Sequence, residues 1–375
     1  MMQGIIIKPG DTLISSTPTI TAAKTVAPVS ELLRTAHNGG PPGMLSRVAD
    51  SIFWMSRYIE RAENVARFIN VNLKLSLDLG SQTAGQWAPL VYTTGDQDFF
   101  KEHYVDPDQR KVIEFLAFDA KNPNSIVSCL RYARENARTV REMISSLMWE
   151  ELNKYFLTVR SAATDRSVFD SPFDFFNQII LSSHLMEGIT DATMSHGEAW
   201  HFARLGRLLE RADKTSRILD VKYFILLPSE RDVGTALDTI QWSALLESAS
   251  ALEMYRKRHG RITPAQVADF LILDREFPRA MHFCLIEAEN SLAAISGHRG
   301  DRIYSSAEQR LGRLRSELNY SRIDEIVNDG LHEFIDDFQQ KLNDVGESIY
   351  ETFFAPTAGA QGPVTTQTQS QTQSR

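Results

Sequence analysis

The stretches "YIERAENVARFI" at residues 58–69 and "LLERADKTSRIL" at residues 208–219 together decide how this chain folds. In both, apolar residues recur every three or four positions, which is the period of an amphipathic helix. Each stretch also carries a Glu-Arg pair followed by further charges, and Glu60 returns as Glu210, 150 positions later. The repetition predicts two helices with the same role in one fold.

The rest of the sequence between residues 44 and 355 also has helical period almost throughout. The one strand-like segment, "LVYT" at 90–93, is too short to build a sheet. We therefore predict an all-α helical bundle. The expected helices cover residues 44–79, 107–118, 124–161, 172–195, 197–226, 235–258, 264–273, 278–297, 305–319 and 323–354.

Further blocks recur in the same order. "QW" at 86–87 returns at 241–242, and "VIEFLAFDAKNPNSIVSCLRYA" at 112–133 returns as "VADFLILDREFPRAMHFCLIEA" at 267–288, both 155 positions later. Several blocks at nearly one offset predict an internal duplication, with repeat 1 at about 44–196 and repeat 2 at about 197–355, packed about a pseudo-two-fold axis.

The two cysteines occupy the same position of the two repeats, since Cys129 and Cys284 also differ by 155. Each lies beside a leucine in a predicted helix. We expect both to be small buried apolar residues and not nucleophiles.

Composition narrows the class of protein. The 375 residues carry a net charge of −8, which argues against a general role in binding nucleic acid. Two cysteines cannot form a disulfide framework, and no zinc-binding spacing is present. No signal peptide and no apolar run of the roughly 18 residues that a membrane helix needs is found. We expect a cytoplasmic protein without a membrane segment.

Both ends are predicted to be disordered. Residues 1–43 are rich in Ser, Thr, Pro and Gly, and residues 356–375 are a low-complexity Gln/Thr/Ser tail. The first strong helix begins directly after Met44. Residues 1–43 are therefore either a disordered extension or the product of a start codon set too early, with Met44 as the true first residue.

Helical geometry places the charges of each stretch on one face, at about 100° per residue. We call these two sets the first row and the second row. The first row consists of Arg57, Glu60, Arg61, Glu63 and Arg67, and the second row of Arg207, Glu210, Arg211, Asp213 and Arg217, with Lys214 beside them.

Three interpretations of the rows remain open. They can form a solvated face with local pairs such as Arg57–Glu60 and Glu63–Arg67. They can form a buried network of Arg–carboxylate pairs that joins the two repeats. They can also form an anion site, in which the arginines bind phosphate or carboxylate while Glu60 and Glu210 orient them or accept a proton.

Two observations weaken the interpretation of a solvated face. Phe53, Phe68 and Val71 project toward the charged side, and the charges keep their spacing in both repeats. The residues of the two rows are therefore our candidate anion- or ligand-binding residues, and catalytic residues are unknown.

Metal binding is not expected. Glu60-x-x-Glu63 and Glu210-x-x-Asp213 place four carboxylates on two helices, as di-iron bundles do, but the Glu-x-x-His repeat of those bundles is absent. A second group of residue types that can bind metals begins at His184-x-x-Glu187 and ends at His201. We expect His201 to be a hydrogen-bonded core histidine and not a metal ligand. "GHRGDR" at 297–302 lacks the Lys-Ser/Thr of a phosphate-binding loop.

Five long motifs of this sequence are similar to those of a known protein family. The motifs are "MLSRVADSIFWMSRYIERAENVAR", "NPNSIVSCLRYARENARTVREMISSLMWEELN", "EAWHFARLGRLLERADKTSRILDVKY", "QWSALLESASALEMYRK" and "GLHEFIDDFQQKL". Together they resemble the bacterial alpha-E family, uncharacterised helical proteins with a recurrent Glu-Arg motif. The resemblance covers about 44–355 and maps the motif to Glu60–Arg61 and Glu210–Arg211, and "ARENAR" to Ala133–Arg138.

The resemblance implies partners. Such proteins are typically encoded beside circularly permuted ATP-grasp proteins and transglutaminase-like proteases, a context of amide-bond formation or cleavage. We therefore expect an accessory protein that holds an anionic ligand, with nucleotide or phosphate as the candidate and no other cofactor. The alternative is an enzyme of amide-bond chemistry that uses Glu60 or Glu210 as general base with the arginine cluster.

Overall fold

The computed structural model describes residues 44–79, 87–224, 235–297 and 305–355. Within these ranges every regular element is a helix and none is a strand, so the predicted all-α class is confirmed. The ends at 1–43 and 356–375, predicted to be disordered, and most of the "GHRGDR" segment lie outside the described residues.

Fifteen α-helices and three shorter helical segments make up the described part of the chain. They are α1 (Ser46–Leu79), α2 (Ala88–Thr94), α3 (Gln97–His103), α4 (Gln109–Ile113), η3 (Glu114–Phe118), α5 (Ile126–Thr139), α6 (Ser146–Thr164), η4 (Arg166–Phe169), α7 (Pro172–Thr193), α8 (Glu198–Phe224), α9 (Ala236–Ser248), α10 (Leu252–His259), α11 (Pro264–Ile272), α12 (Met281–Ser296), α13 (Ser306–Tyr320), α14 (Ile323–Asp329), α15 (Leu331–Ile349) and η6 (Tyr350–Phe354).

The local structure differs from the expected helices at two places. The strand-like segment 90–93, for which no helix was expected, lies within α2, which ends at Gly95 in a left-handed conformation. The single helix expected over 124–161 is divided into α5 and α6. The division occurs because the Ser145 hydroxyl accepts a hydrogen bond from the Met148 N–H at 3.2 Å and so begins a new helix.

Two further predicted helices are divided by residues with positive φ. Ser250, with φ 50°, interrupts the range 235–258, and Gly330, with φ 118°, interrupts the range 323–354. A residue in this region cannot continue a right-handed helix. The sequence pattern on both sides of each break is helical, which is why the breaks were not predicted.

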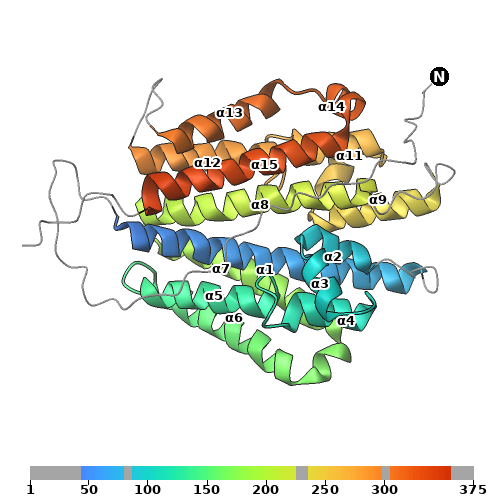
Figure 1. Ribbon diagram of the computed structural model, residues 1–375, viewed down its shortest axis with the longest axis horizontal. Helices are drawn as coiled ribbons and strands as arrows, with labels where there is room; N and C mark the ends of the chain where they lie inside the picture. Colours follow the sequence, from blue (N-terminus) through green and yellow to red (C-terminus); the bar gives the residue numbers. More distant parts are fainter. Residues whose placement is uncertain (1–43, 80–86, 225–234, 298–304, 356–375) are drawn as a thin grey trace, which may run out of the picture. The chain divides into compact units, whose positions relative to one another are not determined.

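The helices α1 and α8 lie side by side at the middle of the bundle (Figure 1). On one side α1 packs against α5 and α7, and α6 contacts both of these. On the other side α8 packs against α12 and α15, and α13 contacts both of these. The two helices that carry the charged rows are therefore the two that meet in the interior.

The contact between α1 and α8 is close at Gly206. A β-carbon at this position would lie 2.4 Å from the Phe53 carbonyl oxygen of α1. Since that oxygen belongs to the backbone, no side-chain rotation can make room. Glycine is therefore required for the two helix backbones to approach this closely.

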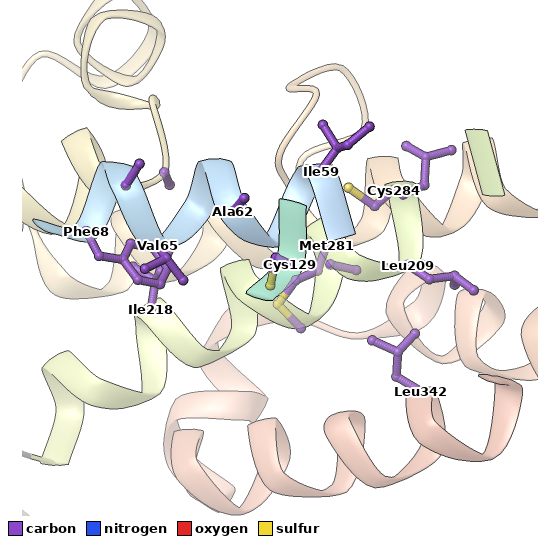
Figure 2. Close-up of a cluster of buried hydrophobic side chains, with 14 of the residues drawn as sticks. Ile59, Ala62, Val65, Phe68, Cys129, Leu209, Ile218, Met281, Cys284 and Leu342 are labelled. Atoms are coloured by element: carbon purple, nitrogen blue, oxygen red, sulfur yellow. The ribbon is translucent and has the colours of Figure 1, made fainter. Parts of the chain in front are cut away.

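Apolar side chains fill the space around the two central helices (Figure 2). Buried residues of this core include Ile59, Ala62 and Val65 of α1 and Leu209 and Ile218 of α8. No helix in the described ranges is both long and apolar enough to cross a bilayer.

Both cysteines are fully buried in this core, as predicted (Figure 2). The thiol of Cys129 contacts the carbonyl oxygen of Pro123 at 3.9 Å, and that of Cys284 contacts the carbonyl oxygen of Pro278 at 3.5 Å. Burial raises the pKa of each thiol to about 12. Neither sulfur is therefore a thiolate at neutral pH.

Candidate functional site

The two charged rows face each other where α1 meets α8. Glu60 and Glu210 are 2% and 0% exposed, and Arg211 is 6% exposed. Phe53 and Phe68, which the sequence placed toward the charged side, are buried as well. The interpretation of the rows as a solvated helix face is therefore wrong.

Two reciprocal ion pairs connect the rows. The guanidinium of Arg61 donates to both carboxylate oxygens of Glu210, at 2.6 and 3.0 Å. The guanidinium of Arg211 donates to both carboxylate oxygens of Glu60, at 2.9 and 2.9 Å. Each Glu-Arg pair therefore binds the Glu-Arg pair of the other helix through two bidentate contacts, which fix orientation as well as charge.

Each central glutamate has further cationic partners. Arg279, in the segment before α12, donates to Glu60 at 2.9 Å. Arg57 donates to Glu210 at 2.9 Å, and the Lys214 ammonium lies 3.6 Å from the same carboxylate. The pair Arg57–Glu60, which the interpretation of a solvated face implied, is thus not formed, and Arg211 and Arg279 bind Glu60 instead.

The second carboxylate of each row is bound in a similar way. Glu63 accepts hydrogen bonds from Arg279 at 2.8 Å and is in contact with Arg67, one turn along α1. Asp213 pairs with Arg217 at 2.9 Å, one turn along α8, and with Lys214 at 3.0 Å. The predicted local pair Glu63–Arg67 is therefore present, but it lies in the interior.

The network reaches solvent through α7. Glu187 accepts a hydrogen bond from Arg211 at 3.1 Å and lies 3.3 Å from Arg207. Its side chain is 38% exposed. On the same helix His184 contacts Glu63 at 3.0 Å.

A small cavity adjoins this edge of the network. Its volume is about 20 Å³, and Glu60, Glu187 and Arg207 supply charged groups to its wall. A cavity of this size holds about one water molecule. A ligand larger than a water molecule therefore does not fit inside this cavity.

The ion pairs set the ionisation of the central carboxylates. Burial alone would raise the pKa of Glu60, but the charges of Arg211 and Arg279 outweigh it and hold this pKa well below its usual range. Burial is likewise outweighed at Glu210, where Arg61 and Arg57 hold the pKa well below its usual range. Both glutamates are therefore ionised at neutral pH.

All ten predicted site residues belong to this network, and two important members were missed. Glu187 was considered only as part of a metal cluster, and Arg279 was not considered. Arg279 occupies the place of Asn124 in the aligned blocks, and Asn124 itself accepts a hydrogen bond from Arg61 at 2.7 Å. The sequence signal that could have identified Arg279 is its place beside Pro278, in a segment otherwise flanked by apolar residues.

The histidines and acids do not gather as metal sites do. Across the described residues, no group of three or more His, Cys, Asp or Glu side chains is placed to bind a metal ion. His201 is half-buried and its Nδ1 has no hydrogen-bond partner, so the prediction of a hydrogen-bonded core histidine is wrong. Its ring instead packs against Trp200, with ring centres 5.0 Å apart.

Relatives of this chain are found in mycobacteria. A protein of Mycobacterium bovis described as uncharacterised is 24% identical over 381 residues, which cover 92% of this chain and 41% of the relative. A likewise uncharacterised protein of Mycobacterium tuberculosis is 23% identical with the same coverage. The chain thus spans about two-fifths of the length of these relatives. No solved structure matches it.

The family comparison covers nearly the whole described chain. Residues 44–354 match Alpha-E, described as a predicted alpha-helical domain with a conserved ER motif. Within the matched residues the chain has Glu-Arg sequences at Glu60–Arg61 and Glu210–Arg211, the pairs that form the reciprocal contacts. The chain therefore belongs to the Alpha-E family.

Proposed function

We propose that this chain is a helical partner protein of an ATP-grasp-dependent amide ligase system and holds an anionic ligand at the edge of the α1–α8 network. The observation that carries the proposal is the state of Glu60 and Glu210, which are buried, ionised and bound by guanidinium groups. Charges arranged in this way hold structure or a ligand in place and do not move protons readily.

The partner role is supported by the length of the relatives. More than half of each mycobacterial relative lies outside the part that matches this chain. A helical unit found within a longer protein is expected to act next to another domain. The nature of that domain, an ATP-grasp ligase with a transglutaminase-like protease as a further partner, rests on the family resemblance alone.

The enzyme alternative is less well supported. A general base works best when its pKa is close to the working pH. The pKa values of Glu60 and Glu210 lie well below the usual range, so both carboxylates accept protons poorly. Removing either glutamate from its arginines to let it act would also leave buried cations without a partner.

An excess of positive charge favours an anionic ligand at one edge. Glu210 and Asp213 form direct ion pairs with four cations, and Asn124 links this group to one more acid, Asp96, at 2.8 Å. The four cations are Arg57, Arg61, Lys214 and Arg217. Since they outnumber these three acids, and three of them are partly exposed, a carboxylate or phosphate group can be bound there.

We also propose that the chain arose by duplication of one helical unit. The helices α1, α5, α6 and α7 pack on one another as α8, α12, α13 and α15 do. The two bidentate contacts are reciprocal, and each cysteine contacts the carbonyl of the proline six positions before it. These correspondences support the offsets of 150 and 155 seen in the sequence.

The partner role is tested with the purified chain and a circularly permuted ATP-grasp protein, the partner that the family resemblance implies. The chain alone is expected to hydrolyse no ATP and to form no amide bond. When added to the ligase it is expected to co-elute with it and to change its rate. Turnover by the chain alone that disappears in Glu60→Gln, measured well below the melting temperature, would establish the enzyme alternative instead.

The ligand is tested by thermal unfolding in phosphate and in chloride at equal ionic strength. Phosphate should raise the melting temperature in a concentration-dependent way, because a ligand that binds only the folded state stabilises it. Arg217→Gln should abolish this rise, whereas Arg322→Gln, at an exposed position elsewhere, should keep it. Equal melting temperatures of the wild type in both salts would contradict the anion site.

A further inference from the structure

Arginines and aromatic rings alternate where α5, the segment after it and α6 lie together. In order they are Arg141, Trp149, Arg134, Phe156 and Arg160, which we call the cation–π ladder. Successive guanidinium-to-ring distances are 4.8, 5.5, 5.3 and 5.5 Å. Arg134 of the ladder is the first arginine of the "ARENAR" motif, and the proposed function assigns no role to that motif.

The arginines at the two ends of the ladder lie over rings but have no carboxylate partner among the described residues. Arg141 and Arg160 are exposed, and neither forms an ion pair with any described residue. Arg134, in the middle, binds Glu135 at 3.1 Å and Asn153 at 2.7 Å. Glu142 and Glu150 are close in sequence but, within the described ranges, form no ion pair with the ladder.

The same face of the molecule carries further positive charge. It consists of Arg131, Arg134 and Arg138, whose spacings of three and four place them on one side of α5, and of Arg141, two residues beyond the end of that helix. Glu135 pairs with Arg134 and with Arg138 and is shared between them. This face therefore has more cations than carboxylates.

The second half of the chain shows that the fold does not require this charge. At the offset of 155, Arg134 corresponds to Glu289 of α12. There Glu289 forms an ion pair with Arg315 of α13 at 2.7 Å. The other three arginines of the face correspond to Ile286, Ala293 and Ser296. The same helix pair thus packs without the arginines.

We propose that the cation–π ladder is a docking surface for a carboxylate-rich polypeptide segment of the partner protein. A guanidinium that lies over a ring uses its face for that contact and can still donate N–H groups to a carboxylate in a bidentate contact. A net charge of −8 disfavours nucleic acid as the occupant. The inference rests on the proposed partner role and adds where the partner binds and by what chemistry.

The test uses a fluorescein-labelled peptide of alternating Glu and Ala and the full chain. Fluorescence anisotropy at low salt should show that the Glu-Ala peptide binds the chain. Neither an unlabelled Gln-Ala peptide nor a single-stranded oligonucleotide of equal charge should displace it. The double variant Arg141→Gln/Arg160→Gln should weaken binding about tenfold, which is the loss of two partly exposed charge pairs. The matched control Arg256→Gln/Arg313→Gln removes the same charge from exposed positions of the second half and should bind as the wild type does.

Three results with the peptide would overturn the inference. They are no binding of the Glu-Ala peptide, equal weakening by the ladder and control variants, and preferred binding of the oligonucleotide. None of them bears on the partner role.

A fourth result would come from the ligase. If the chain forms a complex with the ligase that the ladder variant leaves intact, the partner role stands and the docking surface is elsewhere. If the peptide binds the ladder but no ligase complex forms, the proposed partner role fails while the ladder still binds carboxylates.

Discussion

Removing the charge of Glu60 tests whether the α1–α8 network holds the bundle together. The substitution Glu60→Gln keeps the size and one acceptor oxygen but removes the negative charge that faces Arg211 and Arg279 at 2.9 Å. Both arginines are less than 10% exposed, so water cannot replace the lost charge. We expect the folded state to be destabilised because buried cations are left without sufficient countercharge.

The magnitude follows from the burial of the pair. Breaking a buried ion pair by removing one partner costs about 3–5 kcal/mol. For a folded region spanning residues 44–354, an unfolding entropy of about 2 cal/mol/K per residue converts this into a melting temperature lower by roughly 5–8 °C. Differential scanning calorimetry and urea unfolding at neutral pH measure both quantities.

An exposed pair provides the control. Glu135 is 45% exposed and binds Arg138, which is 62% exposed. Glu135→Gln should change the free energy of unfolding by less than about 1 kcal/mol. If Glu60→Gln changes stability no more than Glu135→Gln does, the network is not a stabilising contact and the reasoning from burial fails. Adding Arg211→Gln to Glu60→Gln should restore part of the loss, because one unpaired cation is then removed.

Two other measurements test the same interface. The depressed pKa values of Glu60 and Glu210 predict that these groups stabilise the folded state fully at neutral pH. The free energy of unfolding should decrease as the pH falls below 4.5, the ordinary pKa, because only the unfolded chain then takes up protons at these groups. Urea unfolding between neutral pH and pH 4 measures this decrease, and its absence would contradict the prediction. Gly206→Ala should destabilise strongly through the contact with the Phe53 backbone, whereas Gly188→Ala, with open space around the new methyl group inside α7, should stabilise by about 0.5–1 kcal/mol, as calorimetry can measure.

Periodicity was sufficient to predict the fold class and the members of the two rows. It succeeded because the rows lie within long regular helices, where a wheel of about 100° per residue places each side chain correctly. It failed at Ser250 and Gly330, where one residue of unusual backbone conformation ends a helix inside a helical pattern. Such breaks depend on tertiary packing, which a pattern of apolar residues does not contain.

The partners of the charges could be predicted less well than the charges themselves. Arg57 lies one turn from Glu60, and local geometry favours that pair. In the folded chain Arg57 bonds Glu210 instead, because another helix brings a fully buried carboxylate within reach. Arg279 was missed for a related reason: it lies in a short connecting segment, and only the packing of α12 against α8 brings it to Glu60.

A buried ionic contact between the central helices has a consequence that an apolar contact would lack. Apolar side chains tolerate a shift of one helix along another with moderate loss, whereas a shift of one turn would break both bidentate contacts of the buried Glu60 and Glu210. Arg61 with Glu210 and Arg211 with Glu60 are satisfied together in one alignment of α1 and α8, the alignment that also brings Gly206 against Phe53. We infer that the Glu-Arg motif fixes the register of the two helices. Fixing that register also fixes the relative positions of the charged edge and the cation–π ladder, the two surfaces on which a ligand and a partner would bind.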